Sequence, residues 1–235
     1  MNIENKYIKV VILAGGYGSR LSEYTKTIPK PMVKIMGKPI IMHIINHYKK
    51  YGFQKFIIAS GYKGEVIKNY FKKKNKNIKV INTGLKTMTG GRVKRLKTYL
   101  HDQVFLMTYG DGLSDVNINN LLKFHRKSKN VATLTAVRPP ARFGSIKLNN
   151  DKVTYFKEKS SLDEGWINGG FFVFEPLVFK YLKGDNTYLE REPLQIISKK
   201  KLLGAFKHKG FWQCMDTRRD KIILEKSIKQ KKYKI

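Results

Sequence analysis

The sequence contains one cysteine and no long apolar run. Cys214 is the single cysteine among 235 residues, so the chain cannot form an internal disulfide. No apolar stretch reaches the roughly 20 residues that a membrane-spanning helix needs. Residues 1–10 mix charges of both signs and lack the apolar core of a signal peptide. These absences predict a cytoplasmic protein with no membrane partner.

Acidic residues are also scarce: 17 Asp and Glu stand against 48 Lys and Arg, giving a formal charge of +31. Such a charge favours polyanionic partners, including nucleic acid. The basic residues are spread from Lys6 to Lys234, however, whereas a nucleic-acid-binding face concentrates them among aromatic residues. We therefore expect no nucleic-acid partner and keep a basic nucleic-acid-binding protein as the weaker alternative. The positive field would also attract nucleotides and sugar phosphates.

The five histidines show no metal-ligand grouping. His43 and His47 share a helical face, but no third ligand is evident, so both are interpreted as ordinary helix residues. Cys214 lacks a partner pattern for nucleophilic catalysis. The sequence therefore predicts neither a zinc site nor a cysteine nucleophile.

Strand and helix patterns alternate through the first half of the chain. Apolar runs predict strands at residues 10–13, 56–59, 78–81, 104–108 and 131–137. Helical spacing predicts helices at residues 39–51, 65–73, 92–100 and 118–126. Strands separated by helices pair in parallel through right-handed crossovers, so this half is expected to be an α/β sheet with flanking helices.

The pattern changes after Pro139 and Pro140. Apolar stretches at residues 145–148 and 153–156 flank an Asn-Asn-Asp turn, which predicts a hairpin. Further strands are expected at residues 171–174 and 203–207, and helices at residues 177–182, 193–199 and 218–232. Because no repeat and no linker is evident, we expect a single domain over residues 1–235.

A glycine-rich loop follows the first predicted strand. It consists of Leu13, Ala14, Gly15, Gly16, Tyr17, Gly18, Ser19 and Arg20. Its glycines let the backbone approach a ligand closely and leave amide groups to face phosphate oxygens. Arg20 adds a cationic fork suited to a triphosphate. The loop matches neither the P-loop nor the dinucleotide fingerprint, and a plain strand-to-helix turn is the alternative.

Lys30 lies between Pro29 and Pro31. The two prolines restrict the backbone on both sides of the lysine, which suits a side chain with a fixed task. An ordinary surface turn is the alternative interpretation of the same residues.

These segments together resemble the sugar-nucleotide pyrophosphorylases, which are nucleotidyltransferases with a Rossmann-like core. More specific segments resemble the glucose-1-phosphate cytidylyltransferase branch, and these lie at residues 87–95, 108–112, 142–144, 167–173, 192–194 and 211–217. The resemblance implies a mixed, mostly parallel sheet flanked by helices, with antiparallel insertions in the second half. It also implies a nucleotide-binding half at residues 1–137 and a sugar-phosphate-binding half at residues 138–235.

The resemblance implies a reaction as well. The expected partners are CTP and a sugar-1-phosphate, with glucose-1-phosphate as the first choice and pyrophosphate as the leaving group. Another nucleotide (UTP, dTTP or GTP) or another phosphorylated acceptor is the closest alternative. The expected cofactor is Mg²⁺, since a bound triphosphate requires it and the ion prefers one or two carboxylates plus phosphate oxygens and water.

The resemblance assigns roles to particular residues. The catalytic residues are Arg20, Lys30 and Asp111. The nucleotide-binding residues are Leu13, Ala14, Gly15, Gly16, Tyr17, Gly18, Ser19, Arg20, Lys30, Thr87, Arg92 and Gly110, and Thr87 and Arg92 are expected near the base, where they would help to select cytosine. The sugar-phosphate-binding residues are Glu158, Lys159, Asn168 and Gly169, and the metal ligands are Asp111 and Asp216. A solvated charge pair is the alternative for Glu158 and Lys159, and helix capping is the alternative for Asp216, as it is for Asp115.

The chain departs from the branch at a few positions. Ser19 and Thr87 exchange one hydroxyl residue for another, Cys214 replaces a proline, and residues 188–191 replace a Trp-Glu-Gln pattern. Residues 70–79 form a short connector where the family has a longer segment associated with subunit contacts. The sequence therefore leaves a homo-oligomer open.

Overall fold

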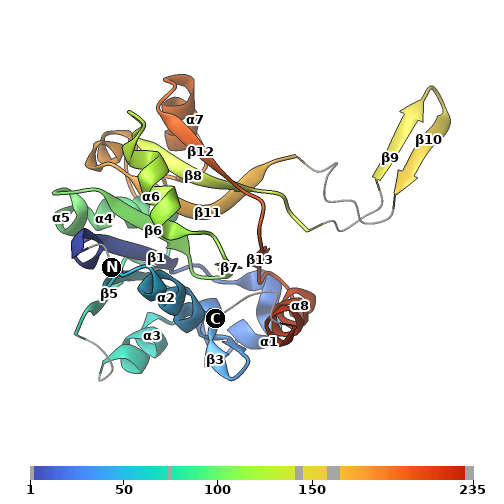
Figure 1. The fold of residues 1–235 in the computed structure, drawn as a ribbon. Helices are drawn as coiled ribbons and strands as arrows, with labels where there is room; N and C mark the ends of the chain where they lie inside the picture. Colours follow the sequence, from blue (N-terminus) through green and yellow to red (C-terminus); the bar gives the residue numbers. More distant parts are fainter. Residues whose placement is uncertain (1–2, 73–75, 141–144, 158–164, 231–235) are drawn as a thin grey trace.

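The computed structural model describes residues 3–72, 76–140, 145–157 and 165–230, which are built around a seven-stranded sheet (Figure 1). The strand order is β12-β8-β11-β6-β1-β4-β5. The bounds are β1 (Lys9–Ala14), β4 (Lys55–Ser60), β5 (Ile78–Asn82), β6 (Phe105–Tyr109), β8 (Ala132–Val137), β11 (Ile167–Phe174) and β12 (Leu203–His208). Strand β11 runs antiparallel to both β6 and β8, and the remaining neighbours are parallel. The expectation of a mixed, mostly parallel sheet is confirmed.

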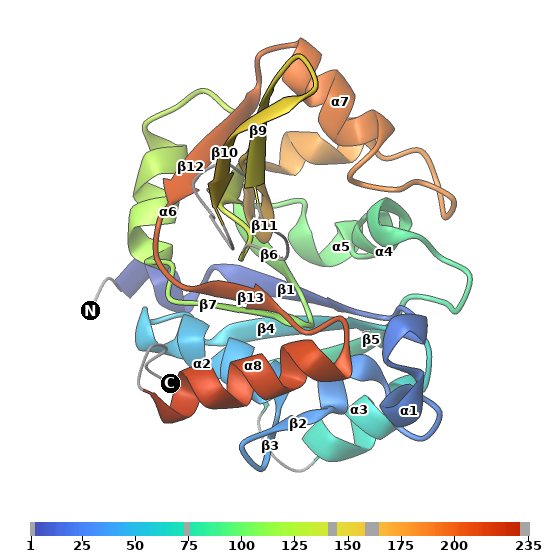
Figure 2. The same ribbon diagram turned by 90° about the vertical axis from the view of Figure 1, so that its right-hand side faces the viewer.

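The central strand β1 shows why this part of the chain forms a parallel sheet. Val10, Val11 and Ile12 are fully buried, because helices cover the sheet on both sides. Val10 and Ile12 belong to one apolar cluster, and Val11 belongs to the other. Figure 2 shows α2 and α8 on one side of the sheet and α4, α5 and α7 on the other.

The helices follow the predicted order. They are α1 (Ser22–Thr25), α2 (Ile40–Lys50), α3 (Gly64–Phe71), α4 (Thr89–Arg95), α5 (Lys97–Leu100), α6 (Ile118–Arg126), α7 (Glu192–Lys199) and α8 (Arg218–Lys229). In the described part of the chain the 3₁₀ turns are η1 (Ile3–Lys6), η2 (Ser19–Leu21), η3 (Lys30–Met32) and η4 (Pro176–Tyr181). Within the described ranges, no helix is both long enough and apolar enough to cross a membrane.

Two helix predictions differ from the structure. The helix expected at residues 92–100 is divided at Leu96, where the backbone adopts φ −94° and ψ 6°. Leu96 and Leu100 are both fully buried in one apolar cluster, so packing determines this break rather than helical periodicity. The helix expected at residues 177–182 is the 3₁₀ turn η4, which begins at Pro176.

Short antiparallel pairs account for the remaining strands. They are β2 (Lys34–Ile35) with β3 (Lys38–Pro39), β7 (Gly112–Ser114) with β13 (Trp212–Cys214), and β9 (Ser145–Asn149) with β10 (Lys152–Lys157). The β9–β10 pair is the predicted hairpin, and in Figure 1 it extends away from the sheet. The β7–β13 pair was not predicted. It places the segment before α8 directly beside the end of β6.

Candidate active site

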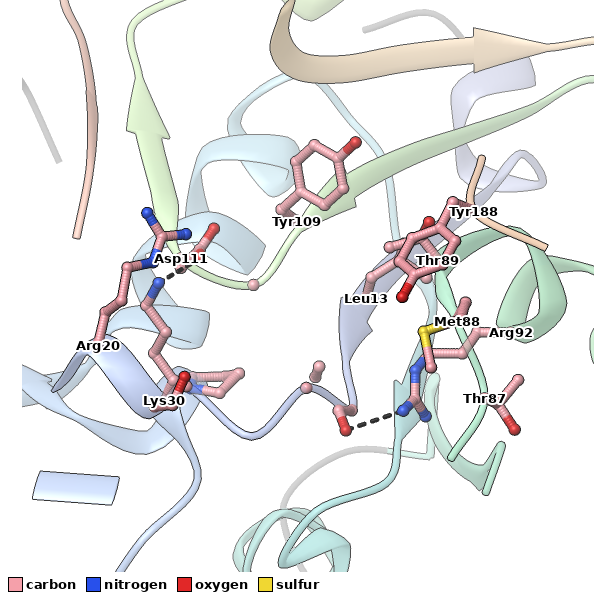
Figure 3. A pocket seen from close by; sticks show the side chains of 17 residues that line it. Leu13, Arg20, Lys30, Thr87, Met88, Thr89, Arg92, Tyr109, Asp111 and Tyr188 are labelled. Atoms are coloured by element: carbon pink, nitrogen blue, oxygen red, sulfur yellow. Dashed lines mark hydrogen bonds and ion pairs between the residues drawn. The ribbon is translucent and has the colours of Figure 1, made fainter. Parts of the chain in front are cut away.

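A pocket of about 330 Å³ opens at the carboxyl ends of β1 and β6 (Figure 3). Ligands of open α/β sheets bind at this end of the strands. The lining residues are Leu13, Ala14, Gly15, Gly16, Gly18, Ser19, Arg20, Lys30, Pro31, Thr87, Met88, Thr89, Arg92, Tyr109, Gly110, Asp111 and Tyr188. The lining thus includes every nucleotide-binding residue that the sequence predicted except Tyr17, whose half-exposed ring lies beside Tyr62.

The glycine-rich loop is held in place at its far end. Gly18 has φ +66°, a left-handed conformation that favours glycine. Its carbonyl accepts hydrogen bonds from the Leu21 amide (2.9 Å) and the Thr25 hydroxyl (3.1 Å). The loop therefore turns immediately into η2, which carries Arg20.

An ionic cluster occupies one end of the pocket. The Lys30 ammonium lies 2.7 Å from Asp111 Oδ2 and 2.6 Å from Asp216 Oδ1, and Arg20 Nη1 lies 2.7 Å from Asp216 Oδ2. The Lys30 side chain is only 12% exposed, whereas that of Arg20 is 75% exposed. The structure therefore brings together four residues from distant parts of the sequence, and the two that lie farthest apart in it are Arg20 and Asp216.

The charge of Lys30 follows from its neighbours. Burial lowers the pKa of its ammonium, but the carboxylates of Asp111 and Asp216 raise it more, and the pKa lies above its ordinary value of 10.5. An opposite charge within hydrogen-bonding distance favours the ionised form. Lys30 is therefore a permanent cation at neutral pH.

Asp111 is positioned by backbone contacts on both sides. The Gly110 amide donates to the Leu13 carbonyl (2.9 Å), which ties the end of β6 to the end of β1. The Met215 amide donates to the Asp111 carbonyl (2.9 Å), next to the β7–β13 pair. These bonds place Asp111 beside Asp216, which follows Met215 directly.

The Asp216 carboxylate is not the cap of α8. Thr217 is the N-cap, and the Thr217 and Asp220 side chains form a reciprocal capping box. Asp220 Oδ2 also accepts the Asp216 amide (3.0 Å), so the cap fixes the backbone of Asp216 while its carboxylate faces Lys30. Capping by Asp115 is likewise wrong, because Asn117 caps α6.

The two carboxylates fit a Mg²⁺ site. In the described part of the chain there is no group of three His, Cys, Asp or Glu side chains that would form a closed protein cage. Mg²⁺ instead needs one or two carboxylates and completes its octahedron with phosphate oxygens and water. Since one ammonium contacts both carboxylates, Asp111 and Asp216 face a common point.

The opposite end of the pocket contains another cation, the buried Arg92. Only 4% of this residue is exposed, and its terminal nitrogens donate to backbone carbonyls and one hydroxyl. Burial lowers the pKa of the guanidinium, and the neighbouring Arg95 lowers it further. Thr87, the other residue expected near the base, is buried nearby and also lines the pocket.

The sugar-phosphate residues are placed less completely. Glu158 and Lys159 lie outside the described residues. Asn168 and Gly169 lie in β11, where the Asn168 side chain accepts the Gly170 amide (2.9 Å) and the Gly169 carbonyl accepts Trp212 Nε1 (2.7 Å). Neither residue is part of the pocket lining, so their roles stay predictions.

Two of the lining residues, Thr89 and Tyr109, were not among the predicted site residues, and both contact Glu190, which is not part of the lining. The Tyr109 hydroxyl donates to Glu190 Oε1 (2.5 Å), and the Thr89 hydroxyl donates to Glu190 Oε2 (2.6 Å). Burial raises the pKa of Tyr109, and the Glu190 carboxylate raises it further. The position of Tyr109 immediately before Gly110 and Asp111 was the available signal, but nothing in the sequence pairs it with a residue 81 positions away.

His43 and His47 are buried in α2, the helix in which they were expected. His43 and His47 donate through Nε2 to the carbonyls of Ile35 and Val116, each at 2.9 Å. Burial and, to a smaller extent, the neighbouring Asp216 carboxylate raise the pKa of Cys214 to about 11, so the thiol is protonated at neutral pH.

Known proteins resemble the chain over nearly its full length. The nucleotidyl transferase family profile matches residues 9–216. A glucose-1-phosphate cytidylyltransferase from Salmonella typhimurium is 45% identical over 93% of this chain and 95% of the relative. A probable glucose-1-phosphate cytidylyltransferase from Bacillus subtilis is 39% identical over 95% of this chain and 97% of the relative.

A solved structure supports the fold independently. A crystal structure of HddC from Yersinia pseudotuberculosis complexed with GMP-PN aligns with a TM-score of 0.72 over 94% of this chain and 99% of that one, at 24% identity. Similarity at this identity establishes the fold alone. The family profile and the two relatives establish more: the chain belongs to the nucleotidyl transferase family.

Proposed function

We propose that the protein transfers a cytidylyl group from CTP to glucose-1-phosphate, forming CDP-glucose and pyrophosphate. The observation that carries this proposal is the position of Lys30 between Asp111 and Asp216, beside a glycine-rich loop at the carboxyl edge of the sheet. The names of the Salmonella and Bacillus relatives support the choice of CTP and glucose-1-phosphate.

The reaction is a single in-line displacement. A phosphate oxygen of the sugar-1-phosphate forms a bond to the α-phosphorus of CTP, and the bond from that phosphorus to the bridging oxygen of pyrophosphate breaks. The attacking oxygen is already anionic, so no general base is needed. The protein must instead bring two anions together and offset the charge that develops.

The residues at the ionic end of the pocket are suited to this task. The loop amides and Arg20 bind the triphosphate, and the largely exposed Arg20 side chain is free to follow it. Lys30 contributes a fixed positive charge at the reacting phosphates, because Pro29 and Pro31 restrict its backbone and the Pro31 side chain is buried.

Asp111 and Asp216 would hold Mg²⁺. When bound, the ion neutralises phosphate charge and orients the α-phosphate. Lys30 then serves as the protein's own cation at the reacting phosphates.

The second half of the chain is proposed to bind the sugar phosphate. Lys159, with Glu158, would anchor the acceptor phosphate, and Asn168 with Gly169 would face the sugar hydroxyls. Residues 1–137 would serve the nucleotide and residues 138–235 the sugar phosphate within one domain. The Trp212–Gly169 hydrogen bond supports this division, because it joins β11 to the segment that carries Asp216.

We also propose a homo-oligomer in the cytoplasm. The β9–β10 hairpin supports self-association: Ile146, Leu148, Val153 and Phe156 share one face and are 53%, 62%, 55% and 66% exposed. The single cysteine is consistent with a reducing compartment. Sedimentation at several protein concentrations tests the oligomer, and a monomer at all of them would contradict it.

One experiment tests the proposed reaction directly. Pyrophosphate release is measured for CTP, UTP, dTTP and GTP, each with glucose-1-phosphate and several other sugar-1-phosphates. We expect the highest kcat/KM with CTP and glucose-1-phosphate. A higher kcat/KM for another pair of nucleotide and sugar-1-phosphate would assign the protein to a different branch of the family. Pyrophosphate release with none of the pairs would contradict the proposal.

A further inference from the structure

We infer that Arg92 is a positioning residue that fixes the orientation of the Gly15–Gly16 peptide, and does not itself read the base. Arg92 is a buried residue with 4% of its surface exposed. Its guanidinium joins three segments that are distant in the sequence. Nη2 donates to the Gly15 carbonyl (2.9 Å), and Nη1 donates to the Ser60 carbonyl (3.1 Å) and the Gly84 carbonyl (2.7 Å). Arg92 therefore connects the loops that follow β1, β4 and β5.

The direction of these bonds determines what Arg92 can do. Both terminal nitrogens donate to protein oxygens, and Nη1 has the Thr83 hydroxyl as a further acceptor at 2.8 Å. A guanidinium has five N–H donors and no acceptor. The donors that Arg92 directs at protein oxygens, including Nη2 toward the Leu85 carbonyl at 3.5 Å, are not available to the edge of a base. In Figure 3 a dashed line joins the Arg92 guanidinium to a backbone oxygen, and this bond is the one to the Gly15 carbonyl.

The hydrogen bond to the Gly15 carbonyl fixes the orientation of one peptide plane in the glycine-rich loop. In a planar trans peptide, the carbonyl and the following amide point in opposite directions. Arg92 holds the Gly15 carbonyl, which also accepts the Tyr62 amide (3.1 Å). The Gly16 amide is therefore directed away from Arg92, with a fixed orientation, in a loop whose amides are proposed to face phosphate.

The glycines of this region support the same inference. A Cβ at Gly15 or at Gly61 would overlap the Arg92 guanidinium. The backbone therefore lies directly against the cation, and two side-chain-free positions are needed to bring it there. The backbone carbonyls take the place that a carboxylate often has beside a buried arginine. The buried charge of Arg92 is therefore hydrogen-bonded without an anionic side-chain partner in the pocket.

The experiment, which rests on the proposed function, compares Arg92→Ala and Arg92→Lys with the wild type. We expect the KM for CTP to rise by roughly tenfold or more in Arg92→Ala, since a small displacement of a binding loop has effects of this size. The KM for UTP should rise in proportion, so that the ratio of kcat/KM for CTP to kcat/KM for UTP stays within about twofold of the wild-type ratio. The KM for glucose-1-phosphate should be unchanged. Arg92→Lys keeps a cation but not the fork, and should restore only part of the loss.

A double-mutant comparison tests the route through the loop. Gly15→Ala displaces the guanidinium, so Gly15→Ala combined with Arg92→Ala should raise the KM for CTP little more than either change alone. Arg95→Ala is the matched control, because Arg95 lies in the same helix and is half-exposed in an ion pair with Asp185. It should leave the KM for CTP within about twofold of the wild type.

Three results would overturn the inference. A CTP-to-UTP ratio that falls toward one in Arg92→Ala would show that the side chain reads the base. An unchanged KM for CTP with a lower melting temperature would show a purely structural role. Additive effects in the double mutant would show that Arg92 and Gly15 affect the KM for CTP independently. If Arg92→Ala does not fold, the same ratios are measured in Arg92→Lys. Wild-type turnover is measured first, so a failure of the proposed reaction is seen separately.

Discussion

The partly buried Lys30 and the buried Arg92 are cations that line the same pocket, yet their partners differ in kind. Lys30 contacts two carboxylates, whereas the acceptors of Arg92 are backbone carbonyls and a hydroxyl. An ion pair in a partly exposed pocket can rearrange when phosphate and a metal ion bring new charges. A guanidinium that links three loops cannot move without moving the backbone. The comparison indicates that one end of the pocket is arranged for chemistry and the other for a fixed binding shape.

The largest expected effect is loss of a carboxylate at the ionic end. Asp111→Asn or Asp216→Asn should lower kcat by about 10³-fold, because each removes a hard anionic oxygen from the proposed metal site. Pyrophosphate release as a function of Mg²⁺ concentration measures the effect, and circular dichroism checks the fold. Asp115→Asn, which alters a carboxylate paired with His208, is the control. Near-normal Mg²⁺-dependent rates in either variant would remove that residue from the metal site.

The next effect concerns Lys30 itself. Lys30→Ala should lower kcat by at least about 10²-fold, the scale typical of losing a preorganised electrostatic group. Steady-state kinetics at saturating substrates measure it, with Lys34→Ala, an exposed lysine four positions away, as the control. If only the melting temperature changes, Lys30 is a structural turn residue and the contrast with Arg92 disappears.

The third prediction concerns the base. A site matched to the polar edge of cytosine leaves buried groups unpaired when uracil is bound, at a cost of roughly 1–3 kcal/mol each. CTP should therefore be preferred over UTP by about tenfold to a few hundredfold with glucose-1-phosphate as the acceptor. The two kcat/KM values are compared directly. Equal or better use of UTP would contradict cytosine selectivity and leave the nucleotidyltransferase assignment unchanged.

The smallest expected effect concerns the helix cap behind Asp216. Thr217→Ala removes one half of the capping box of α8 and should lower the free energy of unfolding by about 1 kcal/mol. Urea denaturation measures this loss, and Thr217→Ser, which keeps the hydroxyl, should retain most of the stability. A stability loss with no change in kcat would show that the Asp216 carboxylate keeps its place without the cap.

Local sequence signals identified much of the site. The glycine-rich loop, Lys30 between two prolines, and Asp111 after an apolar strand were recognisable because each lies within a short segment with a distinctive pattern. All of these residues line the pocket except Tyr17. The mixed sheet was also predictable, since the alternation of strands and helices limits the possible topologies.

Contacts between distant segments were not predictable in the same way. Residues 92–100 have continuous helical spacing, but the burial of Leu96 and Leu100 divides them into α4 and α5. The strands β7 and β13 are three residues each, too short to show an alternating pattern. Their pairing exists only because the chain returns to the end of β6 about 100 residues later.

The sequence by itself therefore determined the class of fold and the position of the glycine-rich loop, and it singled out the two carboxylates. Periodicity and short motifs carry that information. Only the tertiary structure decided that Lys30 lies between Asp111 and Asp216, that Thr217 and not Asp216 caps α8, and that Arg92 is directed at the Gly15 carbonyl. Each of these depends on which backbone and side-chain groups meet once distant strands have paired. A buried donor takes the acceptors that packing leaves beside it, and no local pattern specifies which those are.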